Sequence, residues 1–107
     1  MHKTVLVLLG LSLLAGCGKP EFNCSESRAY NAATKIVERH LKSPSTAKFP
    51  LSNSSTVRIG AAGKCKYRVE SYVDSQNAFG TMVRTPFSLT VEGFPAEDEW
   101  LGSDLSM

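Results

Sequence analysis

The segment from Lys64 to Asp74, KCKYRVESYVD, is the feature that most restricts the fold, because apolar and charged side chains alternate along it. In a β-strand successive side chains point to opposite faces, so this alternation predicts a strand with one buried face and one solvated face. The face expected to be buried carries Cys65, Tyr67, Val69, Ser71 and Val73.

Two further strands are expected, one on each side of this strand. Residues 57–59 alternate in the same way, and residues 60–63 (GAAG) are interpreted as the hairpin connection that follows them. Residues 81–92 form the third strand, after the turn-forming residues 75–80 (SQNAFG). Because proline cannot donate to a sheet ladder, Pro86 predicts that this strand lies at an edge or is bulged there. Its inner face should carry Val83, Thr85, Phe87, Leu89 and Val91.

The segment before the strands predicts one amphipathic helix. Ser25 can cap its N-terminus, and Glu26 in the first turn complements the helix dipole. Pro44 disfavours the helical conformation at Ser43, so the helix should end there. Phe49 is the large apolar residue of the next connection, and we expect it to anchor that connection to the core. The apolar stripe of the helix recurs at three- and four-residue spacing and contains Tyr30, Ala33, Ile36, Val37, His40 and Leu41.

These elements predict an α+β fold of two layers, in which one N-terminal amphipathic helix packs on a three-stranded antiparallel meander. The helix should cover one sheet face and leave the other open. Residues 97–99, followed by Trp100 and Leu101, are interpreted as an acidic C-terminal tail. The element order resembles that of small envelope lipoproteins that assist outer-membrane assembly, and this resemblance implies an architecture only.

The N-terminal segment has the pattern of an export signal. Met1-His2-Lys3 is a short basic start, and residues 4–14 (TVLVLLGLSLL) carry no charge. This apolar run is too short to span a hydrocarbon core, which needs about 20 apolar residues. A charged start, a short apolar run and small residues after it predict a secretory signal peptide.

The four residues Leu14-Ala15-Gly16-Cys17 resemble a bacterial lipobox. The resemblance implies lipidation of the Cys17 sulfur and cleavage between Gly16 and Cys17. It also implies sorting to the outer membrane, because Gly18 stands where lipoproteins of the inner membrane often carry Asp. The chain then divides into a signal peptide (1–16), a lipidated tether (17–24) and one small domain (25–107). The alternative is an ordinary secretory signal with an incidental cysteine.

Cys24 and Cys65 remain as an even pair once Cys17 is assigned to lipid. In an exported protein such a pair favours a disulfide, and closing a loop of about 40 residues contributes roughly 4 kcal/mol in the chain-entropy model. Two free thiols or an intermolecular bridge are the alternatives. No CxxC or HxxxH spacing accompanies the pair, so we predict no zinc site.

Two segments of the domain resemble a family of small bacterial and prophage-associated proteins without a characterised activity. They are LKSPSTAKFP (41–50) and SYVDSQNAFG (71–80), within a resemblance that spans about residues 36 to 91. Because members of that family carry different N-terminal attachments, lipoprotein leaders included, the resemblance implies a module that is reused in several contexts.

The sequence offers no recognisable catalytic constellation. It contains no GxSxG, no HExxH and no glycine-rich phosphate loop, and His40 is the one histidine after the leader. We therefore predict a non-enzymatic protein without a cofactor or a bound metal, and a hydrolase is the least favoured reading.

The candidate partner-binding residues are Lys64, Lys66, Arg68 and Tyr72 on the outer sheet face, together with Phe79 at a hairpin end. Basic residues interleaved with an aromatic can bind nucleic acid, but export argues against that partner. An anionic envelope polymer or an envelope protein is the expected partner. A solvated sheet face is the alternative reading of the cations, and turn chemistry is the alternative reading of the hairpin end.

The expected function is that of a lipoprotein on the periplasmic side of the outer membrane whose domain binds another envelope component. The alternative is an exclusion or immunity lipoprotein linked to a prophage or plasmid. The sequence leaves the oligomeric state open, and its formal net charge of +2 identifies no partner by itself.

Replacing Cys17 with Ser should abolish incorporation of a labelled fatty acid and leave an unprocessed precursor, because the lipid is transferred to a thiol. The measurement is metabolic labelling followed by electrophoresis of the full chain. Equal labelling of the wild type and the Cys17→Ser variant would contradict the lipoprotein assignment.

Overall fold

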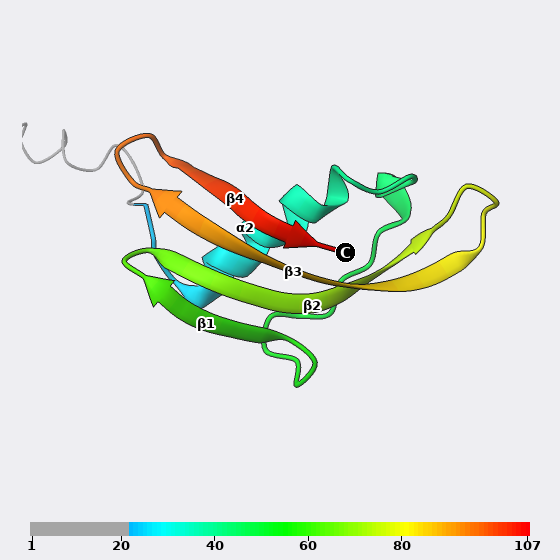
Figure 1. The fold of residues 1–107 in the computed structure, drawn as a ribbon, viewed down its shortest axis with the longest axis horizontal. Coiled ribbons are helices and arrows are strands. Elements are labelled where there is room, and N and C mark those ends of the chain that lie inside the picture. The colour runs from blue at the N-terminus through cyan, green and yellow to red at the C-terminus, as the bar shows by residue number, and fades with distance from the viewer. Residues whose placement is uncertain (1–21) are drawn as a thin grey trace, which may run out of the picture.

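The computed structural model describes residues 22–107, which form one helix packed on one face of a four-stranded antiparallel sheet (Figure 1). The strands follow one another across the sheet in the order β1-β2-β3-β4. This arrangement confirms the two-layer α+β fold and the meander, and it adds a fourth strand to the three that were expected. Gly16 and Cys17 lie outside the described residues. The elements are α2 (Glu26–Glu38), the 3₁₀ turn η1 (Pro44–Thr46), β1 (Arg58–Gly63), β2 (Lys66–Gln76), β3 (Met82–Phe94) and β4 (Glu99–Ser106).

The segment expected to be part of an acidic tail forms β4 instead. Trp100 pairs with Gly93 across the β3–β4 ladder and packs against the core. Gly102 faces the helix so closely that an added Cβ would lie 2.8 Å from Ile36 Cδ1. The prediction was wrong because most of β4 is exposed and polar, so its sequence carries only a weak alternation.

The alternation of β2 is confirmed, because Val69, Ser71 and Val73 are buried while Glu70 is exposed. The start of the strand differs from the prediction. Cys65 lies in the turn between Gly63 and Lys66, with its backbone in the left-handed region (φ 52°). The GAAG segment, expected to be this connection, belongs to β1 and pairs with β2.

The helix begins as the sequence predicts. Ser25 Oγ accepts a hydrogen bond from the Arg28 backbone N–H, and Ala29, Tyr30, Ala33 and Val37 are the buried residues. The helix ends at Glu38, which is earlier than the expected end at Ser43. Residues 39–43 leave the helix, and η1 follows them with Pro44 in its first turn.

The connection after the helix is fixed to the core and to the edge of β2. Phe49 packs edge-on against Phe87 with ring centroids 6.0 Å apart, which confirms its expected role as an anchor. The Tyr30 hydroxyl donates to the Pro50 carbonyl at 2.6 Å and lies 3.3 Å from Ser71 Oγ. Burial raises the pKa of Tyr30, so this hydroxyl stays protonated and available as a donor.

Strand β3 is interior along one half and an edge along the other. Residues from Ser88 to Phe94 pair with β4, whereas Pro86 pairs only with Tyr72 of β2. Pro86 therefore lies where no ladder hydrogen bond is required on its free side, which confirms its predicted edge position.

A disulfide joins Cys24, just before the helix, to Cys65 in the β1–β2 turn. The space around it is tight, because a Cβ on Gly93 would lie 2.6 Å from the Cys65 sulfur and 2.8 Å from the Phe22 ring. The Gly93 N–H also donates to the Cys65 carbonyl at 2.8 Å. The bond therefore fixes the start of α2 against the end of the sheet where β3 meets β4.

The double variant Cys24→Ser, Cys65→Ser should lower the free energy of unfolding by about 2–4 kcal/mol, because the chain-entropy gain of a loop of this length is lost. The measurement is denaturant unfolding of residues 22–107, which contain no third cysteine. Reducing agent should lower the stability of the wild type by a similar amount and leave the double variant unchanged. Equal stability of the oxidised wild type and the double variant would contradict a stabilising role.

Candidate interaction surface

The outer face of the sheet, turned away from α2, carries charges of both signs rather than a cationic field. Arg58 of β1 lies opposite Glu70 of β2, with 3.6 Å between a guanidinium nitrogen and a carboxylate oxygen. Lys66 lies opposite Glu92 of β3 in the register of the sheet. The positive charge expected on this face is therefore balanced locally by neighbouring carboxylates.

Arg68 holds three strands together. Its guanidinium donates to Ser88 Oγ at 2.9 Å and to Thr90 Oγ1 at 3.1 Å on β3. It also donates to the backbone carbonyl of Asp104 on β4 at 3.4 Å. The sequence pattern predicts that Arg68 is a free surface cation, but these three hydrogen bonds direct its guanidinium to neighbouring strands of the sheet.

Tyr72 belongs to a second charged group further along the same face. The Arg84 guanidinium lies over the Tyr72 ring, 3.9 Å from its centroid. The same guanidinium donates to both carboxylate oxygens of Asp74, at 2.8 and 2.9 Å. These hydrogen bonds hold the pKa of the Asp74 carboxyl below its usual value and raise the pKa of Arg84.

The five predicted binding residues therefore lie in separate places. Lys66, Arg68 and Tyr72 share the outer face of β2, whereas Lys64 lies in the β1–β2 turn. Phe79 lies beyond the other end of β2, in the turn before β3. No single surface brings all five together.

The turn that carries Phe79 is well ordered by its own hydrogen bonds. The Asn77 side-chain oxygen accepts from the backbone N–H groups of Phe79 and Thr81 at 2.9 and 3.0 Å. Gly80 has a φ of 84°, in the left-handed region that tight hairpin turns use and that glycine adopts without steric cost. The turn presents the Phe79 side chain 91% exposed at the tip.

The β2–β3 hairpin continues past the ends of β1 and β4, so its last residues project from the body of the domain (Figure 1). Met82 and Val83 near this tip are also exposed. The hairpin thus carries three large exposed apolar side chains within five residues of chain.

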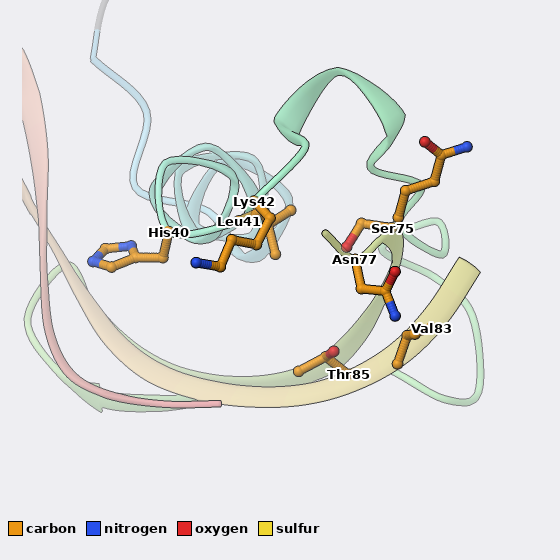
Figure 2. Close-up of a pocket in the computed structure, with 8 residues that line it drawn as sticks. His40, Leu41, Lys42, Ser75, Asn77, Val83 and Thr85 are labelled. Atoms are coloured by element: carbon orange, nitrogen blue, oxygen red, sulfur yellow. The ribbon is translucent and has the colours of Figure 1, made fainter. Parts of the chain in front are cut away.

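An open groove lies between the C-terminal end of α2 and the inner face of the hairpin (Figure 2). It encloses about 300 Å³. Figure 2 shows side chains from the segment just after α2 on one side and from the β2–β3 hairpin on the other, with open space between them. The lining residues are His40, Leu41, Lys42, Ser75, Gln76, Asn77, Val83 and Thr85.

Several of these groove residues were missed by the sequence reading. Alternation places Val83 and Thr85 on the inner face of β3, where the covering helix was expected to bury them. The helix ends at Glu38 and does not cover this part of the sheet. The signal that could have found the groove is the length of the strands relative to the length of the helix.

Across residues 22–107, no group of three or more His, Cys, Asp or Glu side chains is arranged to hold a metal ion. Over the same residues, no helix is long and apolar enough to cross a membrane.

Comparison with known proteins returns no match: no family model fits the chain, and neither a curated protein nor a solved structure matches it. The resemblance to a family of small prophage-associated proteins therefore stays a prediction.

Replacing Arg68 with Met should lower the free energy of unfolding by about 1–2 kcal/mol, because the hydroxyl and carbonyl partners of Arg68 lose their donor. The matched control is Arg58→Met, since the Arg58 side chain is 83% exposed and its ion pair with Glu70 is long. That control should change stability by less than about 0.5 kcal/mol. Chemical denaturation of both variants checks the difference, and equal effects would show that Arg68 is an ordinary surface cation.

Proposed function

We propose that this chain is a lipid-anchored protein of the bacterial cell envelope whose small domain binds another envelope component through the tip of the β2–β3 hairpin. The activity is binding rather than catalysis. The projecting hairpin with its exposed Phe79 is the single observation that carries the proposal.

The described chain begins at one end of the domain, and the hairpin tip lies at the other end (Figure 1). The first described residue is Phe22, and its ring centroid lies 5.4 Å from that of Trp100 at the start of β4. This is the end of the sheet where β3 finishes, and the hairpin tip precedes the start of β3. A strand of 13 residues extends about 40 Å. With Cys17 lipidated, the attachment to the membrane would precede the end of the domain that lies opposite the hairpin tip.

The exposed side chains of the tip suit protein recognition. A phenylalanine can bury 150–250 Å² in a contact, and aromatic anchors on rigid supports carry much of the energy of protein interfaces. Asn77 fixes the backbone of the turn that carries Phe79, so little backbone conformational entropy is lost on binding. The side chains of Phe79, Met82 and Val83 are exposed and do not belong to the core. Exposed apolar side chains that gather in this way mark a surface for interaction with a partner.

A photo-crosslinking amino acid at position 79 should form a discrete adduct in living cells that express the full chain. The matched control is the same amino acid at Leu51, which is 76% exposed but lies in the loop before β1. Phe79→Ser should reduce recovery of the adduct partner about tenfold or more, as expected for an aromatic anchor. Leu51→Ser should leave it unchanged, and neither change should alter the melting temperature.

The proposal fails if position 79 forms no adduct, or if both positions capture the same proteins equally. An adduct formed instead from a residue at position 66 or 70 would move the binding surface to the outer sheet face.

A further inference from the structure

We propose that the free edge of the β2–β3 hairpin, along residues 82–87 of β3, binds an extended segment of the partner protein, which adds to the sheet as a further strand in line with β4. Resting on the proposed function, this assignment names the form in which the partner binds at the hairpin: a polypeptide strand, held by its backbone as well as by its side chains.

The edge of β3 that faces β4 is paired along only part of its length. β4 pairs with β3 from Ser88 to Phe94, so residues 82–87 have no neighbouring strand on that side among residues 22–107. Six residues of a strand extend about 20 Å. A free edge of this kind is a row of unpaired backbone N–H and C=O groups, to which an extended polypeptide can add.

The hydrogen bonds of Asp74 show which backbone groups point to this edge. Asp74 exchanges two backbone hydrogen bonds with Lys48, at 2.8 and 2.9 Å, on the side away from β3. Arg84 lies opposite Asp74 in the β2–β3 ladder, so the two form a pair whose backbone groups point away from each other. The N–H and C=O of Arg84 therefore point to the free edge. Those of Met82 do so as well, because the pattern repeats every two residues.

Pro86 belongs to the same set of outward residues. It presents a carbonyl to the free edge but no N–H. The donors of the edge are therefore the N–H groups of Met82 and Arg84, and its acceptors are the carbonyls of Met82, Arg84 and Pro86. A proline at an edge limits pairing with strands in general, so this edge admits a short segment rather than a whole sheet.

The other edge of the hairpin is already occupied. Beyond its pairing with β1, β2 is bonded to the connection that contains η1. Lys48 pairs there with Asp74, and Thr46 Oγ1 accepts from the Gln76 backbone N–H at 2.9 Å. A partner strand therefore has one side of the hairpin with which it can pair, and that side is the one in line with β4.

Hollows flank the free edge on both faces of the sheet. On the inner face lies the groove of Figure 2, with Val83 and Thr85 on one wall and Leu41 on the other. A second hollow of about 370 Å³ lies beside the end of β4, and Pro86 and Ser88 line it from the outer face. Because successive side chains of a strand point to opposite faces, a segment added here would place alternate side chains in the two hollows.

The side chains along the edge indicate the composition of the segment. Met82 is 47% exposed and Val83 is 42% exposed, on opposite faces of β3, so both faces offer apolar contacts. Arg84 between them is engaged by the Asp74 carboxylate. An uncharged segment rich in β-branched residues, which favour strands, matches this edge. A polysaccharide or a lipid headgroup presents no regular row of donors and acceptors that would pair with it.

The test in cells uses the photo-crosslinking amino acid at position 79 of the full chain. Met82→Pro removes an outward N–H and no hydrogen bond within the domain, whereas the matched control Met82→Leu keeps both the N–H and an apolar side chain. Met82→Pro should reduce recovery of the adduct partner about fivefold or more, and Met82→Leu should stay within about twofold of the wild type. Slow hydrogen exchange of the Val83 and Thr85 amides, which face β2, checks that the Met82→Pro hairpin is intact.

A synthetic peptide tests the backbone directly. A fluorescent peptide of alternating threonine and valine should bind the full lipidated chain in detergent, as measured by fluorescence anisotropy, and its N-methylated counterpart with the same side chains should not. Peptide binding should also slow hydrogen exchange of the Met82 and Arg84 amides. Pro86→Thr restores an outward N–H, so it should strengthen peptide binding about threefold.

The outcomes separate this proposal from the proposed function. Equal recovery from Met82→Pro and Met82→Leu would show that side chains of the tip alone bind the partner, which overturns strand addition and leaves the proposed function intact. No binding of the peptide, or equal binding of its N-methylated counterpart, would also overturn it. Dimers of the chain with protected Met82 and Arg84 amides in the absence of peptide would make a second copy the occupant. Failure of the proposed function would be seen instead as the absence of any adduct at position 79.

Discussion

The structure depends on packing a short helix against long strands. The helix α2 has 13 residues and extends about 20 Å, whereas β3 also has 13 residues and extends about 40 Å. Tyr30, Ala33 and Val37 bury one part of the inner sheet face against Val69, Val73 and Leu89. The connection after the helix covers a further part, where Phe49 packs on Phe87, and the end of the hairpin with Val83 extends past both. The projecting hairpin and the groove beneath it follow directly from this difference in length.

Other contacts determine which end of the sheet the helix covers. The Cys24–Cys65 disulfide joins the start of α2 to the β1–β2 turn, and the Tyr67 hydroxyl donates to the Cys24 carbonyl at 3.0 Å. Phe22 and Trp100 pack at the same end. Because the helix is fixed there, its short length leaves the opposite end exposed, and that end carries Phe79.

The charges of the domain divide into two functional kinds. On the outer sheet face, Arg68 and Arg84 donate hydrogen bonds to hydroxyls, a carbonyl and a carboxylate of neighbouring strands, whereas Arg58 makes only a long, exposed ion pair with Glu70. Lys42, just beyond the end of α2, makes no side-chain ion pair within 4 Å among the described residues.

The elements that rest on local patterns could be predicted from the amino-acid sequence. Alternation gave β2 and most of β3, the Ser25 cap and the apolar stripe gave α2, and the even cysteine pair gave the disulfide. The fold class and the place of Phe79 in a hairpin turn followed from these. The leader and its lipobox resemblance lie outside the described residues, so the anchor remains a prediction from sequence.

The fourth strand, the role of Arg68 and the groove depend on tertiary contacts and could not be predicted from local patterns. Strand β4 forms because β3 has a free edge with which it can pair, and because Trp100 packs against the core. The weak alternation of β4 itself does not predict either contact. Arg68 becomes a structural residue because three strands bring Ser88, Thr90 and Asp104 within its reach. Val83 stays exposed because the helix ends before reaching it. Each depends on which segments lie side by side, and a local pattern of side chains cannot specify that.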